Sequence, residues 1–369
     1  MNRFPIRIVI SGGHSGGHFF PAFSFAQKLK TAHPEAKIHF LFARFPDFAG
    51  PLLSDAGFHR QLIEIPPVPK FFSLKMISFL LQYIFVYIQT FLFILNLEPS
   101  LVVGFGSYAS IPSVLCASML RIPILLHEQN LSAGRASRFL SFFANRVGVS
   151  FPETRGIVQT RKVFISGYPL REDFLSAFQS PEQQNRQKPF TILIFGGSQG
   201  ARRLNGIFLE VITQLNAEEL KELAVKHIVG NDNIDRIREI YSKLNVKAEV
   251  DFFSYKIGED YRAADLIISR SGAGTVFELI AAGRPAILIP YPHAYAHQKL
   301  NAEFLSAHDA AEVLHEEDLT AHTLSETILN LRHNKKRREE IVLHLKQLNQ
   351  PNSSEHLVEE AWELICKKN

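Results

Sequence analysis

The stretch SGGHSGGHFF, residues 11–20, places four glycines and two histidines between an apolar run and a segment with helical spacing. The preceding run IRIVI (6–10) predicts a buried strand, and the following FFPAFSFAQKLK has Pro21 near the start of a predicted helix. A strand, a glycine-rich turn and a helix N-terminus favour a bound anion, because unpaired N–H groups and the helix dipole attract negative charge. The stretch therefore predicts a phosphate site.

The same alternation of strand and helix continues along the chain. Further strands are expected at 37–43, 101–108, 122–130, 146–151 and 162–169. The polar stretch 176–189 predicts a linker, after which a strand, a glycine loop and a helix appear again in TILIFGGSQGARRLNGIFLEVITQL, from residue 191. The pattern predicts an α/β protein with two Rossmann-like, doubly wound parallel-sheet domains that face a cleft, with ligands beyond the carboxyl ends of the strands.

The composition is that of a globular protein. The chain has 369 residues, enough for two or three domains, with 46% hydrophobic and 21% charged residues. A net charge of +4 suits phosphate-bearing or lipid partners and is too small to argue for nucleic acid. Two cysteines without CxxC spacing favour a reducing, cytosolic compartment, and the first apolar run, about five residues long, is too short for a signal peptide.

One apolar segment, MISFLLQYIFVYIQTFLFILNL (76–97), is long enough to resemble a membrane span. Its polar residues gather within about 60° on a helical wheel, which favours a helix lying on a sheet or on a bilayer surface; they are Ser78, Gln82, Gln89 and Asn96, with Lys75 beside them. Lys70, Phe71 and Phe72 precede them as a basic and aromatic rim. We expect a packed helix with one end at the membrane; a plain core helix and a true span are the alternatives.

Two common nucleotide sites do not fit the glycine loops. A dinucleotide site needs G-x-G-x-x-G and an acidic residue about 20 positions on. The first loop lacks that spacing, and the second expected strand ends in Ala43-Arg44 without a carboxylate. The chain also has no G-x-x-x-x-G-K-[ST] motif for ATP.

With these segments identified, the chain resembles the MurG family, peptidoglycan glycosyltransferases of the two-domain GT-B class, over nearly its whole length. The resemblance is carried by GGHSGGHFFPA (12–22), GFGSYASIP (104–112), HEQN (127–130), GYPLR (167–171), GGSQGARRLN (196–205), RSGAGTVFELIAAGRPAILIP (270–290) and HQKLNA (297–302). Two positions depart from the family pattern: His14 stands in the first loop where the family has a glycine, beside Ser15, which keeps the hydroxyl of the family's threonine, and Tyr168 replaces an asparagine.

The resemblance implies an N-terminal, acceptor- and membrane-facing domain over 1–170, with a C-terminal helix at about 353–369 packing back on it, and a UDP-GlcNAc-binding domain over 171–352. It implies inverting transfer of GlcNAc from UDP-GlcNAc to lipid I, which gives lipid II in peptidoglycan synthesis and so serves cell-wall biogenesis, cell shape and cell division. A glycolipid synthase with a diacylglycerol-type acceptor and a non-catalytic nucleotide-sugar-binding scaffold are the alternatives.

The resemblance also assigns roles to single residues. His18 matches the family's proposed base for the acceptor hydroxyl, and Glu128 is assigned to catalysis beside it. His127 is either a second proton carrier or a packing partner. Ser254 corresponds to a residue that holds uracil through its backbone, and Glu278 to the carboxylate that grips the ribose. The remaining substrate-binding residues are Ser15, Gly16, Gly17, Asn130, Arg171, Ser198, Ala273, Gly274, Thr275, His297 and Gln298.

The expected partners are UDP-GlcNAc, lipid I, the cytoplasmic membrane surface and other cell-wall synthesis proteins, without nucleic acid. No cofactor and no metal are expected, since no cluster has metal-ligand spacing. The expected location is the cytoplasmic face of the inner membrane, as a peripheral protein.

Overall fold

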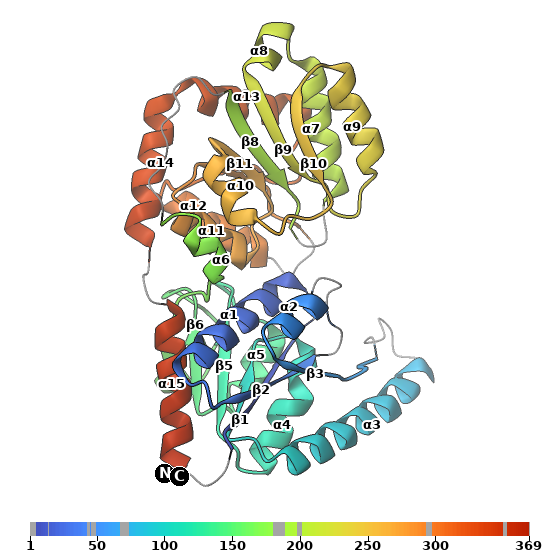
Figure 1. Ribbon diagram of the computed structural model, residues 1–369, viewed down its shortest axis with the longest axis vertical. Helices are drawn as coiled ribbons and strands as arrows, with labels where there is room; N and C mark the ends of the chain where they lie inside the picture. Colours follow the sequence, from blue (N-terminus) through green and yellow to red (C-terminus); the bar gives the residue numbers. More distant parts are fainter. Residues whose placement is uncertain are drawn as a thin grey trace. The chain divides into compact units, whose positions relative to one another are not determined.

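The computed structural model describes residues 5–13, 15–42, 45, 49–66, 74–179, 189–197, 201–292, 297–349 and 353–368. It divides into two compact units, the first formed by Met1–Pro169 with Pro351–Asn369 and the second by Leu170–Gln350 (Figure 1). The polar stretch 176–189 therefore lies inside the second unit and does not join the two, and its residues 180–188 are outside the described ranges.

The first unit is built on a parallel sheet of seven strands in the order β3-β2-β1-β4-β5-β6-β7. Its strands are β1 (Arg7–Gly12), β2 (Lys37–Phe42), β3 (His59–Leu62), β4 (Leu101–Gly104), β5 (Ile124–Glu128), β6 (Arg146–Val149) and β7 (Val163–Ile165). Its helices are α1 (Gly16–Ala32), α2 (Ala49–Asp55), α3 (Leu74–Leu97), α4 (Ile111–Met119), α5 (Arg135–Leu140) and α15 (Ser353–Lys368), with 3-10 turns at Tyr108–Ser110 and Thr160–Lys162.

Alternating side chains of the buried strands supply a core on each face of this sheet. Ile8 and Ile10 of β1 pack on one face with residues of α1 and α15, while Val9 packs on the other with residues of α3 and α4. The C-terminal helix α15 is fixed by Leu357, Val358, Ala361 and Ile365 in the first of these cores. Because α15 completes that core, the first unit needs both ends of the chain.

The second unit repeats the plan with a parallel sheet of six strands in the order β10-β9-β8-β11-β12-β13. Its strands are β8 (Phe190–Phe195), β9 (Leu223–Ile228), β10 (Lys247–Asp251), β11 (Leu266–Ser269), β12 (Ala286–Leu288) and β13 (Glu312–Val313). Its helices are α6 (Glu172–Ser176), α7 (Arg202–Gln214), α8 (Ala217–Lys221), α9 (Ile234–Lys243), α10 (Ile257–Ala263), α11 (Ala273–Ala282), α12 (His297–Ala307), α13 (Ala321–His333) and α14 (Lys335–Leu348).

Both sheets have the strand order of a doubly wound fold, which confirms the predicted fold class. The order reverses between β1 and β4 in the first unit and between β8 and β11 in the second. Ligands of such sheets bind outside the carboxyl ends of the strands at this reversal. The glycine loops that follow β1, β4 and β11 all lie there.

Helix α3 packs on the first unit through one face, with Tyr87, Phe91, Phe93 and Leu97 partly buried at its edges. Val86, Thr90 and Ile94 are buried, whereas large apolar side chains on another side of the helix are 45–64% exposed, namely Ile77, Leu80, Leu81, Ile84, Phe85, Ile88, Leu92 and Leu95. By length and apolarity α3 could cross a membrane, and 17% of that stretch is buried in the protein. The exposed apolar face therefore extends along the whole helix, whereas the sequence predicted that only one end would be available to a membrane.

Candidate functional site

The first glycine loop leads directly into α1. Ser15 is the N-cap residue of α1, and its carbonyl accepts hydrogen bonds from the N–H groups of His18 and Phe19, both at 3.0 Å. The Ser15 hydroxyl makes no capping bond, and Gly16 and Gly17 form the first residues of the helix. This arrangement leaves the hydroxyl of Ser15 available to a ligand at the positive end of the helix dipole. His14 lies outside the described residues.

His18 is oriented by the second glycine loop, which follows β4. Its Nδ1 lies 2.8 Å from the carbonyl oxygen of Phe105, and because a carbonyl only accepts, Nδ1 donates its proton there. The lone pair of the neutral ring is then on Nε2, the tautomer that a general base needs. The ring is partly exposed.

The two glycine loops pack against each other tightly. A Cβ atom at Gly13 would lie 2.7 Å from Cβ of Ser107 and 2.8 Å from Cδ2 of His18. Ser107 has φ 68° and ψ 154°, a backbone region essentially limited to glycine. The loop beside His18 is therefore held in a strained conformation.

We expect Ser107→Gly to raise the free energy of unfolding by about 1 kcal/mol, since relief of about 1–3 kcal/mol of backbone strain exceeds the entropic cost of a glycine. Urea unfolding of the whole chain measures it. Ser118→Gly, near the end of helix α4, is the control and should lower stability by about 0.5 kcal/mol. A loss of stability in both variants would contradict the prediction.

Glu128, at the end of β5, is a buried carboxylate that organises its own loop. Its Oε1 accepts hydrogen bonds from the backbone N–H and the side-chain amide of Asn130, at 3.0 and 3.2 Å, and its Oε2 accepts one from the N–H of Gly134 at 3.1 Å. Glu128 is 2% exposed. The contacts favour a positioning role that orients Asn130, and the catalytic role of Glu128 stays a prediction.

His127 has the environment of a structural histidine. It is 1% exposed, its Nε2 lies 3.1 Å from the carbonyl oxygen of Gly167, and its Nδ1 lies 3.0 Å from the amide nitrogen of Gln129. Burial lowers the pKa of His127 to about 4, so the ring is neutral near pH 7. Of the two sequence interpretations, the packing partner fits these contacts. Tyr168, the next residue after Gly167, is also buried.

In the second unit, two predicted donor-site residues come together around a tyrosine that the sequence did not single out. The hydroxyl of Tyr261, in α10, donates to Oε2 of Glu278, in α11, at 2.9 Å. Burial raises the pKa of Glu278, and the nearby Arg171 guanidinium opposes that rise. Arg171 is the N-cap residue of α6, and its Nε lies 3.6 Å from Oδ1 of Asp173. Arg171 and Glu278 are thus neighbours in space.

The N-termini of α11 and α12 form a second cluster. Ala273, Gly274 and Thr275 are the first residues of α11, which has no side-chain cap. The Ser271 hydroxyl donates to the carbonyl of Gln298 at 2.8 Å, and the amide oxygen of Gln298 accepts from the N–H of Tyr291 at 2.9 Å. His297 is the first residue of α12. These bonds bring two of the predicted sugar- and phosphate-binding segments together.

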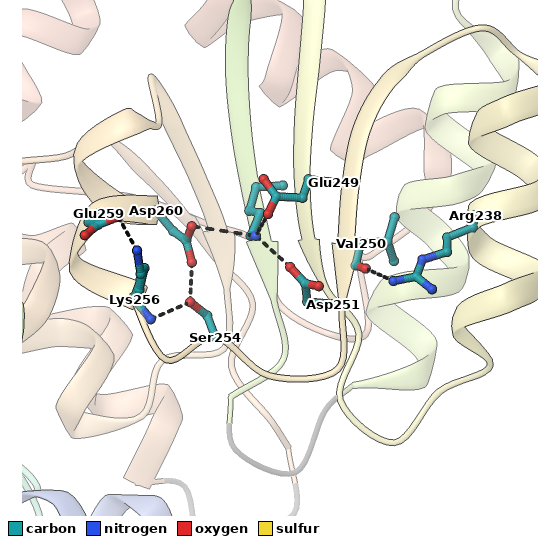
Figure 2. Close-up of polar contacts among 9 residues, drawn as sticks. Arg238, Glu249, Val250, Asp251, Ser254, Lys256, Glu259 and Asp260 are labelled. Carbon is teal, nitrogen blue, oxygen red and sulfur yellow. Dashed lines mark hydrogen bonds and ion pairs between the residues drawn. The ribbon is translucent and has the colours of Figure 1, made fainter.

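Ser254 lies in the loop after β10, within the polar network of Figure 2. Its hydroxyl donates to Oδ2 of Asp260 at 2.5 Å and accepts from the N–H of Lys256 at 3.1 Å. The side chain is therefore engaged in the loop itself. Ser198 lies outside the described residues, so its predicted contact with the phosphates stays a prediction.

In the described part of the chain, no group of three or more His, Cys, Asp or Glu side chains is placed to hold a metal ion. The expectation of a site without metal or cofactor stays a prediction.

The class of protein follows from two family matches that cover both units. Residues 8–149 match the glycosyltransferase family 28 N-terminal domain, and residues 191–356 match the glycosyltransferase family 28 C-terminal domain. The crystal structure of MurG from Acinetobacter baumannii has the same fold, with a TM-score of 0.75 and 28% identity over 97% of this chain and 100% of that chain. The chain is a two-domain glycosyltransferase of the GT-B type.

The particular family is given by similar sequences. A UDP-N-acetylglucosamine–N-acetylmuramyl-(pentapeptide) pyrophosphoryl-undecaprenol N-acetylglucosamine transferase of Geobacter metallireducens is 33% identical, over 88% of this chain and 90% of its own length. The enzyme of that name from Thermodesulfovibrio yellowstonii is 32% identical, over 98% of this chain and 100% of its own length. The chain belongs to this family, the MurG transferases. UDP-GlcNAc 2-epimerase from Neisseria meningitidis shares the fold alone, with a TM-score of 0.67 and 14% identity over 99% of this chain and 100% of that chain.

Proposed function

We propose that this chain transfers GlcNAc from UDP-GlcNAc to the muramoyl sugar of lipid I, with inversion at the anomeric carbon, and so forms lipid II. In a chain of this family, the main structural support for this reaction is the contact of His18 Nδ1 with the carbonyl of Phe105. It fixes a partly exposed imidazole beside two glycine loops, with its basic nitrogen directed away from that carbonyl.

The reaction is a single displacement. Nε2 of His18 takes the proton from the acceptor hydroxyl while that oxygen forms its bond to C1 of GlcNAc. The bond from C1 to the diphosphate oxygen breaks, and its electron pair leaves with UDP. The N-terminus of α11 and the guanidinium of Arg171 offset the charge that develops on UDP.

The donor would be held by groups of the second unit. Glu278 accepts hydrogen bonds from the ribose hydroxyls, the backbone near Ser254 binds uracil, and Ser198 contacts the phosphates. The first residues of α11, together with His297 and Gln298, lie against the sugar and its diphosphate. In the first unit, Ser15, Gly16, Gly17 and Asn130 would contact substrate oxygens near the reacting carbon.

The exposed face of α3 supports a peripheral location on the cytoplasmic face of the inner membrane, where a lipid-linked acceptor lies. Its exposed side chains are aliphatic or aromatic along the helix, and its polar stripe, with Ser78, Gln82 and Gln89, is also exposed. A helix with an apolar face beside a polar one lies in the interface plane of a bilayer. Other cell-wall synthesis proteins would be further partners at this surface.

Transfer of labelled GlcNAc from UDP-GlcNAc to a soluble lipid I analogue tests the proposal, with diacylglycerol as a competing acceptor. We expect product from the lipid I analogue and none from diacylglycerol. Product with diacylglycerol alone would favour a glycolipid synthase. Binding of UDP-GlcNAc without product would favour the non-catalytic scaffold, and either result would overturn the proposal.

A further inference from the structure

Helix α10 carries adjacent side chains that contact both parts of the predicted nucleoside site. Tyr261 donates to Glu278, and Asp260 accepts from Ser254. We propose that α10 is the positioning element of the donor site: Tyr261 orients the carboxylate of Glu278 for the ribose diol, and Asp260 fixes the turn at Ser254 whose backbone meets the base. The inference rests on the proposed function of this site and adds the residues that set its nucleotide specificity.

Tyr261 has little freedom to move. It is fully buried, and its ring packs against those of Phe174 and Phe195, with ring centroids 5.2 and 5.8 Å away. A buried phenol needs a hydrogen-bond partner, and the partner here is Oε2 of Glu278 at 2.9 Å. The bond fixes the rotamer of Glu278, while the carboxylate keeps acceptor positions for the two hydroxyls of a diol, since it has about four lone-pair sites.

The hydrogen bond also favours the form of Glu278 that a diol requires. Burial raises the pKa of Glu278, and the nearby Arg171 guanidinium and the hydroxyl of Tyr261 both oppose that rise. Without the Tyr261 donor, burial would raise the pKa of Glu278 further. The carboxyl group would then be less well oriented and a poorer hydrogen-bond acceptor. Tyr261 therefore affects ribose binding without touching the nucleotide.

Asp260 acts on the loop after β10. The Ser254 hydroxyl connects Asp260 to the N–H of Lys256, which closes the turn from residue 254 to residue 256. Nζ of Lys226 lies 2.5, 2.7 and 3.8 Å from oxygens of Glu249, Asp251 and Asp260. These three carboxylates are labelled in Figure 2. The turn is thus tied to β9 and β10, and its backbone groups are fixed in place.

The helix itself is packed closely against α6. A Cβ atom at Gly258 would lie 2.9 Å from the carbonyl oxygen of Phe174 and 3.0 Å from its Cα, so only glycine permits this approach. Arg262 donates to the carbonyl of Ala177 at 2.9 Å. Because Arg171 is the N-cap residue of α6, the same packing brings Arg171 close to Glu278. Helix α10 therefore connects the base, ribose and phosphate groups of the site.

The test compares the affinities of the full chain for UDP, 2′-deoxy-UDP and CDP by isothermal titration calorimetry. We expect Tyr261→Phe to weaken UDP by about tenfold or more and 2′-deoxy-UDP much less, because a hydrogen bond that orients a charged acceptor is lost. Its preference for UDP over CDP should remain. Ser254→Ala should instead reduce the preference for UDP over CDP. Its ratio of UDP affinity to 2′-deoxy-UDP affinity should remain that of the wild type.

Tyr241→Phe is the matched control, since Tyr241 is a buried phenol of the same unit and its hydroxyl lies 2.9 Å from Nδ1 of His227. Tyr241→Phe should lower stability. It should leave unchanged both the affinity ratio of UDP to 2′-deoxy-UDP and that of UDP to CDP. If Tyr261→Phe keeps the wild-type ratio of UDP to 2′-deoxy-UDP while Glu278→Gln loses UDP affinity, the inference is overturned and the proposed site stands. If Glu278→Gln also binds UDP like the wild type, the assignment of the ribose site fails and the inference with it.

Discussion

Replacement of His18 by alanine is expected to lower the rate of GlcNAc transfer to a soluble lipid I analogue by about 100-fold or more, because the acceptor hydroxyl then lacks its base. The effect should fall on kcat. UDP affinity should be unchanged, since the contacts to the nucleotide itself, through Glu278, Ser254 and Ser198, are predicted in the second unit. The carbonyl of Phe105 orients the ring but cannot replace it as a base.

The measurement is steady-state transfer of labelled GlcNAc, together with calorimetric binding of UDP. His59→Ala serves as the control, because His59 is an exposed histidine on the edge strand β3 of the same unit and should transfer at the wild-type rate. Similar rates for His18→Ala and the wild type would remove His18 as the base and leave the transferase function intact. A loss of UDP binding in His18→Ala would show a structural defect.

The buried strands were accessible from sequence, whereas two of the edge strands, β3 and β13, were not. Strands such as β1 and β4 are apolar runs because both of their faces are covered, and that composition alone indicates them. Strand β3, with the sequence HRQL, is exposed at every position, and β13 has two residues. Both are strands because a neighbouring strand pairs with them, and no local pattern encodes that pairing.

In the candidate site, too, some residues could be predicted from sequence and others only from the fold. His18 and Glu278 stand in recognisable motifs, so their roles could be predicted from the resemblance. Tyr261 reads as an ordinary core residue of a short helix, and its partners Phe174, Phe195 and Glu278 come from three other elements. The two interpretations of His127 likewise needed the fold, because burial and the Gly167 carbonyl distinguish them.

Replacement of Leu81, Ile84 and Ile88 by glutamate is expected to lower the binding of the chain to phosphatidylglycerol vesicles by at least about 100-fold. These side chains are 64%, 55% and 50% exposed, so they contribute little to the core and are available to a bilayer. Burial of one such side chain in an apolar medium is worth about 1.5–3 kcal/mol, and three carboxylates are in addition repelled by anionic lipid. Transfer to lipid I in vesicles should fall with binding.

Vesicle co-sedimentation and transfer to a soluble lipid I analogue separate membrane contact from catalysis. The soluble acceptor should be used at the wild-type rate, because the variant keeps the buried residues of α3, Val86, Thr90 and Ile94. The matched control places three glutamates on the exposed polar stripe of the same helix, at Ser78, Gln82 and Gln89, and should lose far less binding. Equal losses in the two variants would mean that net charge governs attachment. Wild-type binding by the Leu81, Ile84 and Ile88 variant would rule out the apolar face of α3 as the membrane contact.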